Sequence, residues 1–293
     1  MATNYLSSLF DVSRKVVLIT GGSRGIGLMV ARGFVQSGAS VIISSRNEQA
    51  CIESAAALTK LGGAGSVSYV PADVSSRDGC ERLADAVAKI CPEGRLDVLV
   101  NNAGCAWGEP IARKSGKMNW GWDKVLDLNV KAPFYLSRAC LPLLRRDGGK
   151  SFDVPSPFPS GQPRPPPSCI VNVGSVVGLL PQDAPTHAYD VSKAAVHHLT
   201  RKMSGDMAPY GVTVNALAPG FVPSKMSEGL NQYASFEEIA SKTALGRLGN
   251  EDDMVGACIY FSSRAGSYCT GVILNVDGGT VGSTRIPLSS AEE

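Results

Sequence analysis

The heptapeptide HAYDVSK, residues 187–193, sets a tyrosine four positions ahead of a lysine. Positions i and i+4 share one face of a helix, so Tyr189 and Lys193 are expected to be neighbours. A free phenol ionises near pH ~10, and its pKa must fall by about three pH units, or roughly 4 kcal/mol, before it ionises near neutrality. An ammonium ~5 Å away contributes roughly 3 kcal/mol of this at an effective dielectric near 20. The pair therefore predicts a tyrosine acid whose pKa is lowered by a lysine.

A Tyr-x-x-x-Lys spacing also arises by chance on amphipathic helices, where the tyrosine packs and the lysine extends its stem along the surface. The spacing alone therefore leaves both interpretations of Tyr189 and Lys193 open. Ser175 lies upstream at the end of an apolar run and Asn129 lies earlier still, within DLNV (127–130), and both acquire a catalytic role only through the family resemblance described below.

A glycine-rich segment, TGGSRGIG (20–27), follows the first apolar run of the chain. Gly21, Gly25 and Gly27 lie where the chain turns from an expected strand into an expected helix. Only glycine lets the backbone come close enough for its N–H groups and the helix N-terminus to hold a pyrophosphate. Such a turn is a weak indication alone, but its place between a strand and an amphipathic helix predicts a dinucleotide site.

The end of the second apolar run, SSRN (44–47), carries no carboxylate. Proteins that bind NAD usually have an acidic residue there for the ribose hydroxyls. Here Ser45 takes that position, Arg46 follows it, and Arg24 lies in the glycine loop. A dianionic phosphate favours guanidinium groups and would be repelled by aspartate. Either arginine alone is compatible with a solvated surface charge, but the two together, without the acid, predict NADP(H).

These residues need a scaffold that brings strand ends together. Seven short apolar runs alternate with helical patterns, and they cover residues 15–20, 40–44, 66–70, 96–100, 169–173, 212–217 and 271–276. Runs that are apolar throughout are typical of parallel strands covered on both faces. The alternation predicts an α/β fold, with a seven-stranded parallel sheet and helices on both faces. We expect one doubly wound Rossmann-type domain over residues 1–293, since no composition shift divides the chain.

Taken together, the motifs resemble the short-chain dehydrogenase/reductase family over about residues 12 to 280. The spacing Gly-x-x-x-Gly-x-Gly, NNAG (101–104), GS (174–175), PG (219–220) and VDGG (276–279) occur in the family's order. Within the family, NNAGCAWG and LPLLRR look most like the rhamnolipid-type β-ketoacyl (3-oxoacyl) reductases and less like the general reductase of fatty-acid synthesis. The resemblance implies an NADPH-dependent reductase that converts a ketone, such as a β-ketoacyl thioester, to a secondary alcohol.

The resemblance also implies a role for each candidate catalytic residue. Ser175 would hydrogen-bond the substrate carbonyl and stabilise the charge that develops on its oxygen. Tyr189 would donate its proton to that oxygen while the nicotinamide delivers hydride to the carbon. Lys193 would also bind the nicotinamide ribose, and the backbone carbonyl of Asn129 would hold a water that resupplies protons through Lys193.

Further cofactor contacts carry over from the family. Asp73 and the Val74 amide would lie beside the adenine, and Asn101 and Gly104 beneath the adenosine ribose. PGFVPS (219–224) would meet the carboxamide, with Ser224 replacing the family's usual threonine. The expected cofactor-binding set is Gly21, Ser23, Arg24, Gly25, Ile26, Gly27, Ser45, Arg46, Asp73, Val74, Asn101, Gly104, Tyr189, Lys193, Pro219, Gly220, Val222 and Ser224.

Two segments depart from the regular alternation. Residues 147–168 hold seven prolines, and because proline fixes φ and lacks a backbone donor, we expect a surface insertion there. Its composition also suits a polyproline ligand for a partner, and it leaves docking of a carrier protein open. Residues 221–247 occupy the place of the family's substrate lid. Their apolar residues suit a moderately apolar ketone and are Phe221, Met226, Leu230 and Tyr233.

Composition narrows the class of protein. A net charge of +2, from Lys+Arg 28 against Asp+Glu 26, gives no basis for nucleic-acid or membrane partners. The eight cysteines form no C-x-x-C pair and only three histidines occur, which argues against a metal site and favours free thiols in a reducing cytoplasm. We assign no motif role to His187, His197 or His198. Of the tryptophans, Trp107 follows NNAGCA and is a candidate wall of the substrate cleft.

Two other functions remain open from the sequence. One is an oxidative NAD(P)-dependent alcohol dehydrogenase acting on a steroid or polyol, and the other is a non-catalytic scaffold that binds NADPH. The two arginines favour reduction, because cellular NADPH is held reduced, and the complete set of catalytic residues favours an enzyme. Family resemblance implies a homodimer or homotetramer that assembles through long helices near 120–146 and 186–209.

Overall fold

The computed structural model describes residues 4–62, 65–112, 120–148, 165–225, 227 and 234–283. Seven parallel strands form one sheet in the order β3-β2-β1-β4-β5-β6-β7, which confirms the predicted fold. The strands are β1 (Val16–Thr20), β2 (Ser40–Ser44), β3 (Val67–Tyr69), β4 (Val98–Asn101), β5 (Ser168–Val173), β6 (Val212–Pro219) and β7 (Ile273–Val276).

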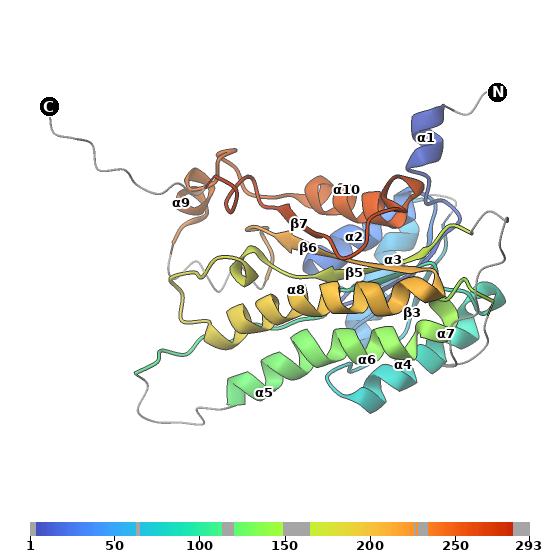
Figure 1. Cartoon of the computed structure of the whole chain (residues 1–293), viewed down its shortest axis with the longest axis horizontal. Helices are drawn as coiled ribbons and strands as arrows, with labels where there is room; N and C mark the ends of the chain where they lie inside the picture. Colours follow the sequence, from blue (N-terminus) through green and yellow to red (C-terminus); the bar gives the residue numbers. More distant parts are fainter. Residues whose placement is uncertain are drawn as a thin grey trace, which may run out of the picture.

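Helices cover both faces of the sheet (Figure 1). They are α1 (Tyr5–Leu9), α2 (Gly25–Gln36), α3 (Glu48–Lys60), α4 (Arg77–Ile90), α5 (Trp120–Leu126), α6 (Ala132–Ala139), α7 (Leu141–Leu144), α8 (His187–Met207), α9 (Phe236–Ser241) and α10 (Glu251–Ser262). One buried cluster joins the sheet to α2, α3 and α10, and it includes Phe34, Leu58 and Phe261. A second joins the opposite face to α4, α6 and α8. Because each face buries its own apolar cluster, the central strands are apolar throughout.

The strand order reverses at β1, which has β2 on one side and β4 on the other. In open parallel sheets, ligands bind beyond the carboxyl ends of the strands at such a point. The loops after β1, β4, β5 and β6 all leave from this carboxyl edge, and they carry the motifs singled out above. In Figure 1 the beginnings of α5 and α8 and helix α9 lie at the left end of the molecule, toward this edge.

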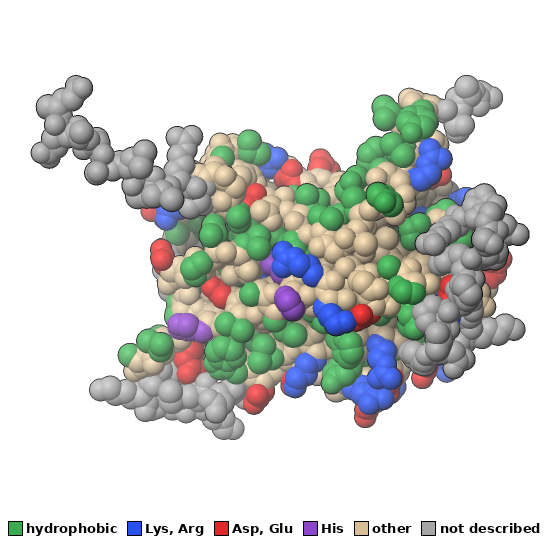
Figure 2. All heavy atoms as spheres, in the orientation of Figure 1, with side chains coloured by type: hydrophobic (Ala, Val, Ile, Leu, Met, Phe, Trp, Pro, Cys, Tyr) green, Lys and Arg blue, Asp and Glu red, His purple; other side chains and the backbone are tan. Residues whose placement is uncertain are grey.

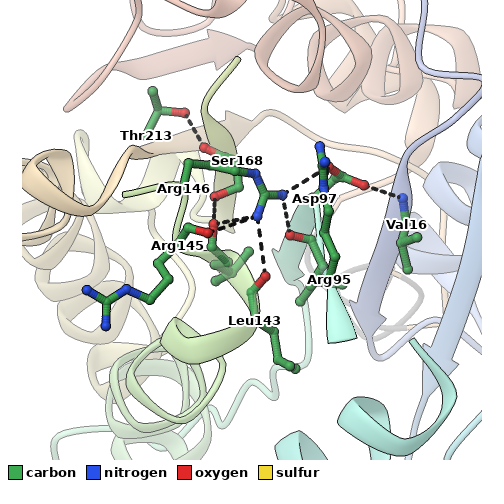
Figure 3. Close-up of polar contacts among 10 residues, drawn as sticks. Val16, Arg95, Asp97, Leu143, Arg145, Arg146, Ser168 and Thr213 are labelled. Atoms are coloured by element: carbon green, nitrogen blue, oxygen red, sulfur yellow. Dashed lines mark hydrogen bonds and ion pairs between the residues drawn. The ribbon is translucent and has the colours of Figure 1, made fainter. Parts of the chain in front are cut away.

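The amino edge of the sheet is held by a buried ionic cluster. One oxygen of Asp97 accepts hydrogen bonds from Arg95 and Arg146, each at 2.9 Å, and the other accepts from the Val16 amide at 2.9 Å (Figure 3). Burial raises the pKa of the Asp97 carboxyl. The hydrogen bond from Val16 and the hydrogen bond and charge of Arg95 together lower it by more, so the pKa lies below its usual value. The cluster ties the starts of β1 and β4 to the segment after α7.

The two end residues of the expected proline-rich insertion (147–168) belong to the body of the protein. Asp147 is paired with Arg145 at 2.7 Å and its side chain is fully buried, so it belongs to the body of the protein. Ser168 is the first residue of β5 and is also buried. Residues 149–164 lie outside the described part of the chain. No helix in the described ranges is both long enough and apolar enough to cross a bilayer.

Candidate active site

The glycine loop winds tightly from β1 into α2. Gly21 and Gly25 have φ of +65° and +54°, a backbone region that side chains disfavour. A Cβ on Gly27 would overlap the Gly21 carbonyl, so glycine is required there as well. The amino end of α2 consequently opens toward the cleft with unpaired N–H groups, which is the geometry that binds phosphate.

Asn102, which the sequence reasoning did not single out, braces this loop. Its amide donates to the Thr20 carbonyl at 2.9 Å and to the Gly21 carbonyl at 3.2 Å. The neighbouring Asn101 turns the other way, and its amide donates to Asn172 at 2.9 Å and to Ser137 at 3.1 Å in the interior. The buried Asn101 side chain therefore faces the core, and contact with a cofactor would fall to its backbone. The sequence offered one indication of Asn102, since it follows the expected cofactor residue Asn101 directly within NNAG (101–104).

The end of β2 approaches the glycine loop through two serines. The Ser23 hydroxyl donates to the Ser45 hydroxyl at 3.0 Å. Arg24 and Arg46 are both exposed, so their guanidinium groups are available to a phosphate at this point. The residues present fit the 2′-phosphate of NADP, since two cations flank two hydroxyl groups and no carboxylate ends β2.

A cavity of about 300 Å³ opens beside Arg46. Its lining residues are Arg46, Ser75, Asp123, Lys124, Asp127 and Leu128. Asp73, after β3, accepts a hydrogen bond from the Ser75 amide at 3.0 Å. Burial raises the pKa of the Asp73 carboxyl, but the hydrogen bonds of Ser75 and the charge of Arg46 outweigh it, and the pKa is lowered. Val74 is buried beside it. Asp73 and Val74 are thus close in sequence to Ser75 in the cavity wall, but neither is among the residues that line the cavity.

The segment after β6 returns to the glycine loop. A Cβ on Gly220 would lie 2.8 Å from the Cα of Asp277, so PG packs directly on VDGG. A Cβ on Gly25 would lie 3.6 Å from the Ser224 Cβ, which places Ser224 against the loop. Val222 is buried and anchors the segment between them. Pro219 ends β6. Residues 219–224 are thus brought together with the expected phosphate site.

Tyr189 and Lys193 lie together on α8, as their spacing predicts. The Lys193 ammonium is 5.5 Å from the centre of the Tyr189 ring and donates to the Val173 carbonyl at 2.7 Å. Ser175 follows β5 and caps the single turn Val176–Gly178. Its hydroxyl lies close enough to the Tyr189 phenol to lower the pKa of that phenol, so the end of β5 and the first turn of α8 present two hydroxyl groups to the same place.

Asn129 lies in a π-helical turn, Asp127–Lys131, between α5 and α6. Its side-chain amide donates to the Cys105 carbonyl at 2.9 Å and to the Ser192 hydroxyl at 3.0 Å, while its oxygen accepts from the Cys105 amide at 2.9 Å. The side chain therefore joins α8 to the NNAG loop. Single π-helical turns recur at functional sites because they interrupt the regular ladder of backbone hydrogen bonds. This leaves the backbone carbonyl as the group of Asn129 that is suited to a water.

The pKa of Tyr189 differs from the expectation. Burial raises the pKa of the phenol to about 12, although the Ser175 hydroxyl opposes the rise. Burial also lowers the pKa of Lys193 to about 8. The expectation that Lys193 brings the tyrosine pKa down toward neutrality is therefore wrong for the protein's own groups, because burial dominates and the opposing effect comes from Ser175 rather than from the ammonium. The phenol stays protonated, which is the state that a proton donor needs.

The substrate side of the cleft is partly aromatic. The Trp107 ring covers Gly121 at the start of α5, and its indole N–H donates to Glu109 at 3.2 Å. Phe221 and Phe236 form an edge-to-face pair with ring centres 5.4 Å apart. In the expected lid, Met226, Leu230 and Tyr233 lie outside the described residues.

Comparison with known families gives two consecutive matches. The model of the short chain dehydrogenase family matches residues 15–157, and that of Enoyl-(Acyl carrier protein) reductase matches residues 161–281. The chain is 36% identical over 271 residues to the rhamnolipids biosynthesis 3-oxoacyl-[acyl-carrier-protein] reductase of Pseudomonas aeruginosa, covering 92% of this chain and 97% of that protein. It is 34% identical to gluconate 5-dehydrogenase of Gluconobacter oxydans, covering 92% and 96%.

Among solved structures, the Pseudomonas aeruginosa RhlG/NADP active-site complex superposes with a TM-score of 0.80 at 35% identity. The match covers 93% of this chain and 98% of that one. The likeness therefore extends over the whole sheet and over both sides of the cleft.

Proposed function

The chain belongs to the short-chain dehydrogenase/reductase family, and we propose that it reduces a β-ketoacyl thioester or a similar moderately apolar ketone to a secondary alcohol. It is an NADP-dependent oxidoreductase acting on C=O and CH–OH groups. One observation carries the proposal. The hydroxyl groups of Ser175 and Tyr189 meet at the carboxyl end of β5, with the Lys193 ammonium 5.5 Å from the tyrosine ring.

In the proposed mechanism, both hydroxyl groups hydrogen-bond the substrate carbonyl oxygen and polarise it. Bound NADPH supplies the hydride that adds to the carbonyl carbon. Tyr189 gives its proton to the oxygen as negative charge develops there, and the charge of Lys193 stabilises the resulting tyrosinate. A water on the Asn129 carbonyl would return a proton to Tyr189 through Lys193.

We propose that the described residues divide the cofactor between them. The glycine loop and the first turn of α2 hold the pyrophosphate, and Arg24 and Arg46 hold the 2′-phosphate. The cavity lined by Arg46 and Ser75 takes the adenine. Ser224 contacts the carboxamide, and Lys193 contacts the nicotinamide ribose.

A second candidate is the oxidation of a polyol or hydroxy acid, since gluconate 5-dehydrogenase is 34% identical to the chain. Oxidation needs a deprotonated tyrosine as base, whereas burial raises the pKa of Tyr189 to about 12. Reduction needs the protonated phenol, which is the form that the protein alone favours. The preference for NADP supports reduction as the physiological direction, because cellular NADPH is held reduced, whereas the pKa of Tyr189 bears only on the pH dependence of each direction.

A substrate panel tests the proposal. Purified protein would be assayed with β-ketoacyl thioesters, simple ketones and, in the reverse direction, gluconate and other polyols, by following nicotinamide absorbance. We expect the highest kcat/KM with a β-ketoacyl thioester and NADPH. A higher kcat/KM for gluconate with NADP⁺ would favour the second candidate, and turnover of none of these compounds would refute both.

Other features of the chain bear on its cellular compartment, its assembly and its substrate lid. All eight cysteines are free thiols, which supports a reducing compartment such as the cytoplasm. Trp122, Phe134 and Val191 are exposed on α5, α6 and α8, and Figure 2 shows hydrophobic side chains gathering over α5 and the amino half of α8. We propose that this face joins copies of the chain in a homodimer or homotetramer.

We also propose that residues 221–247 act as the substrate lid, with the Phe221–Phe236 pair at its base.

A further inference from the structure

His197 is a buried histidine that the proposed mechanism does not use. It lies on α8 one turn after Lys193, and 2% of its surface is exposed. Neither ring nitrogen makes a hydrogen bond of standard geometry within the described residues, although the Gly178 backbone lies close enough to act on the ring. Buried polar groups are nearly always well paired, so an imidazole so weakly paired beside Lys193 calls for an explanation.

The imidazole supports the end of β5. A Cβ on Gly174 would overlap the Nε2 and Cδ2 atoms of His197, so the backbone at Gly174 rests directly on the ring. From the other side, the Gly174 amide donates to the Leu217 carbonyl of β6 at 2.7 Å. Gly174 is therefore held between β6 and His197, and the next residue is Ser175.

The turn after Ser175 also lies on α8. A Cβ on Gly178 would lie 2.6 Å from the Lys193 carbonyl carbon and 2.7 Å from the Ala194 nitrogen. The Gly178 amide donates to the Ser175 carbonyl at 3.1 Å and closes the turn. Lys193 holds Val173, just before Gly174, through the hydrogen bond of 2.7 Å. Three successive supports from α8 thus set the path of the chain on both sides of Ser175.

The charge state of the ring suits such a support. Burial lowers the pKa of His197 to about 4, the charges of Lys193 and Arg201 lower it as well, and the Gly178 backbone acts in the other direction. The ring is neutral at working pH and adds no second charge beside Lys193. Its contribution is the volume that it fills directly beneath Gly174.

We propose that His197 is a positioning residue for carbonyl reduction: its neutral imidazole holds the Gly174–Ser175 segment at the height at which the Ser175 hydroxyl meets the Tyr189 phenol. The proposal rests on the proposed function, because Ser175 acts on the same carbonyl oxygen. It assigns a role to a residue for which the motifs of the sequence gave none.

A double-mutant cycle tests the proposal by kinetics. We expect His197→Ala to lower kcat by about 10- to 100-fold while KM for NADPH stays within about twofold, because the cofactor contacts are untouched. If His197 acts through Ser175, adding His197→Ala to Ser175→Ala should leave kcat within about twofold of the single Ser175→Ala variant. His198→Ala is the matched control, since His198 is the exposed neighbour on the same helix and should retain the wild-type kcat.

A variant that preserves most of the His197 side-chain volume distinguishes a loss of positioning from a loss of folding. His197→Gln refills most of the space and should recover most of the kcat lost in His197→Ala, with an unchanged circular dichroism spectrum. Independent effects of His197→Ala and Ser175→Ala that multiply in the double variant would overturn the proposal. So would a kcat of His197→Ala equal to that of the wild type.

Crystal structures of the wild type and of His197→Ala give a readout that needs no substrate. We expect the distance between the Ser175 hydroxyl and the Tyr189 phenol to be longer in the variant than in the wild type. An unchanged Ser175–Tyr189 distance would overturn the proposal whatever the substrate. Failure of the wild type to reduce any carbonyl would instead refute the proposed function, and the structural comparison would still decide the role of His197.

Discussion

The proposed mechanism gives the Lys193 ammonium three tasks. It donates one hydrogen bond to the Val173 carbonyl at 2.7 Å, and in the proposal it also presents its charge to Tyr189 and its remaining donors to a ribose. An ammonium has three donors, so one fixed bond to the backbone aims the other two without using them up. The bond also holds the cation in a site that disfavours charge, where burial lowers its pKa to about 8.

Tyr189→Phe removes the proton donor and keeps the ring. We expect turnover of the ketone to fall by roughly 10²- to 10⁴-fold, the usual contribution of a positioned acid, with NADPH affinity nearly intact. Single-turnover kinetics and fluorescence titration with NADPH would measure the two quantities. Tyr268→Phe is the matched control, because Tyr268 is fully exposed and should be silent. Equal activity in Tyr189→Phe would remove the mechanism.

The protonation of Lys193 predicts a pH dependence. With the pKa lowered to about 8 by burial, the free enzyme carries the cation below that pH and loses it above. We expect kcat/KM for NADPH, which reports the free enzyme, to fall as the pH rises through 8. Lys193→Arg keeps its charge and should not show this fall, although its activity is low. A flat wild-type profile across this range would contradict the assignment.

Cofactor choice is also decided by single residues. Arg46→Asp combined with Arg24→Ala removes two guanidinium groups and adds a repelling charge at the end of β2. Charge-assisted hydrogen bonds contribute about 1.5–3 kcal/mol each, so we expect the ratio of NADPH to NADH affinity to fall by at least about 100-fold. Arg14→Asp, a charge reversal at an exposed site outside the cleft, is the control. An unchanged ratio in the double variant would refute the role of the two arginines.

At the scale of elements, the strands were predicted well because a parallel sheet covered on both faces leaves apolar runs in the sequence. The helix expected over 120–146 is instead α5, a π-helical turn, α6 and α7. The break lies at Asn129, whose side chain binds the backbone of Cys105. The partner is distant in the sequence, and the apolar pattern continues through the turn. For this reason no local signal reveals it.

The candidate site was likewise predicted from the sequence only in part. Motif order placed Ser175, Tyr189 and Lys193 correctly relative to one another, because one short strand end and one helix carry them all. The adjacent pair Asn101 and Asn102 was harder, since successive side chains at a strand end point to opposite faces and the motif does not say which faces the cleft. The sequence did not reveal that the side chains of Tyr189 and His197 are buried. Their burial depends on how β5, β6 and α8 pack, and no spacing of residues in the sequence encodes it.

The ionic cluster at the amino edge predicts a stability effect. Asp97→Asn would leave Arg146 buried with a weakened partner, and breaking a buried pair usually costs about 3–5 kcal/mol in the free energy of unfolding. The folded pKa of Asp97 is lowered, so its contribution is present above the unfolded value of 3.8 and is lost as the pH falls through the folded pKa. Urea unfolding of Asp97→Asn at neutral pH would measure the loss. Asp85→Asn, at an exposed site, is the control, and equal stability of both variants would contradict the buried role.

At the scale of the whole molecule, the two edges of the sheet have separate tasks. The carboxyl edge carries the hydroxyl pair, the glycine loop and the cavity, whereas the amino edge carries the ionic cluster of Asp97 and Arg146 (Figure 3). Strand β5 links them, with Ser168 at one end and Ser175 just beyond the other. At about 3.3 Å per residue, the two serines are roughly 20 Å apart. A change at the amino edge therefore acts on the reaction over this distance, without contact with the reacting groups.

This separation predicts how the chain tolerates loss of its proline-rich segment. The described residues that flank the segment, Gly148 and Pro165, lie beyond α7 and before β5, on the amino side of the sheet. Deleting residues 150–164 keeps Asp147 with Arg145 and keeps Ser168 in β5. We expect kcat/KM for a small ketone to stay within about twofold and the unfolding free energy within about 1 kcal/mol, because closure cost grows slowly with loop length. Assays with a small ketone and with a carrier-bound thioester would separate two functions of the segment. A loss confined to the carrier-bound substrate would assign it to docking, and a loss with the small ketone as well would mean that the two edges are coupled.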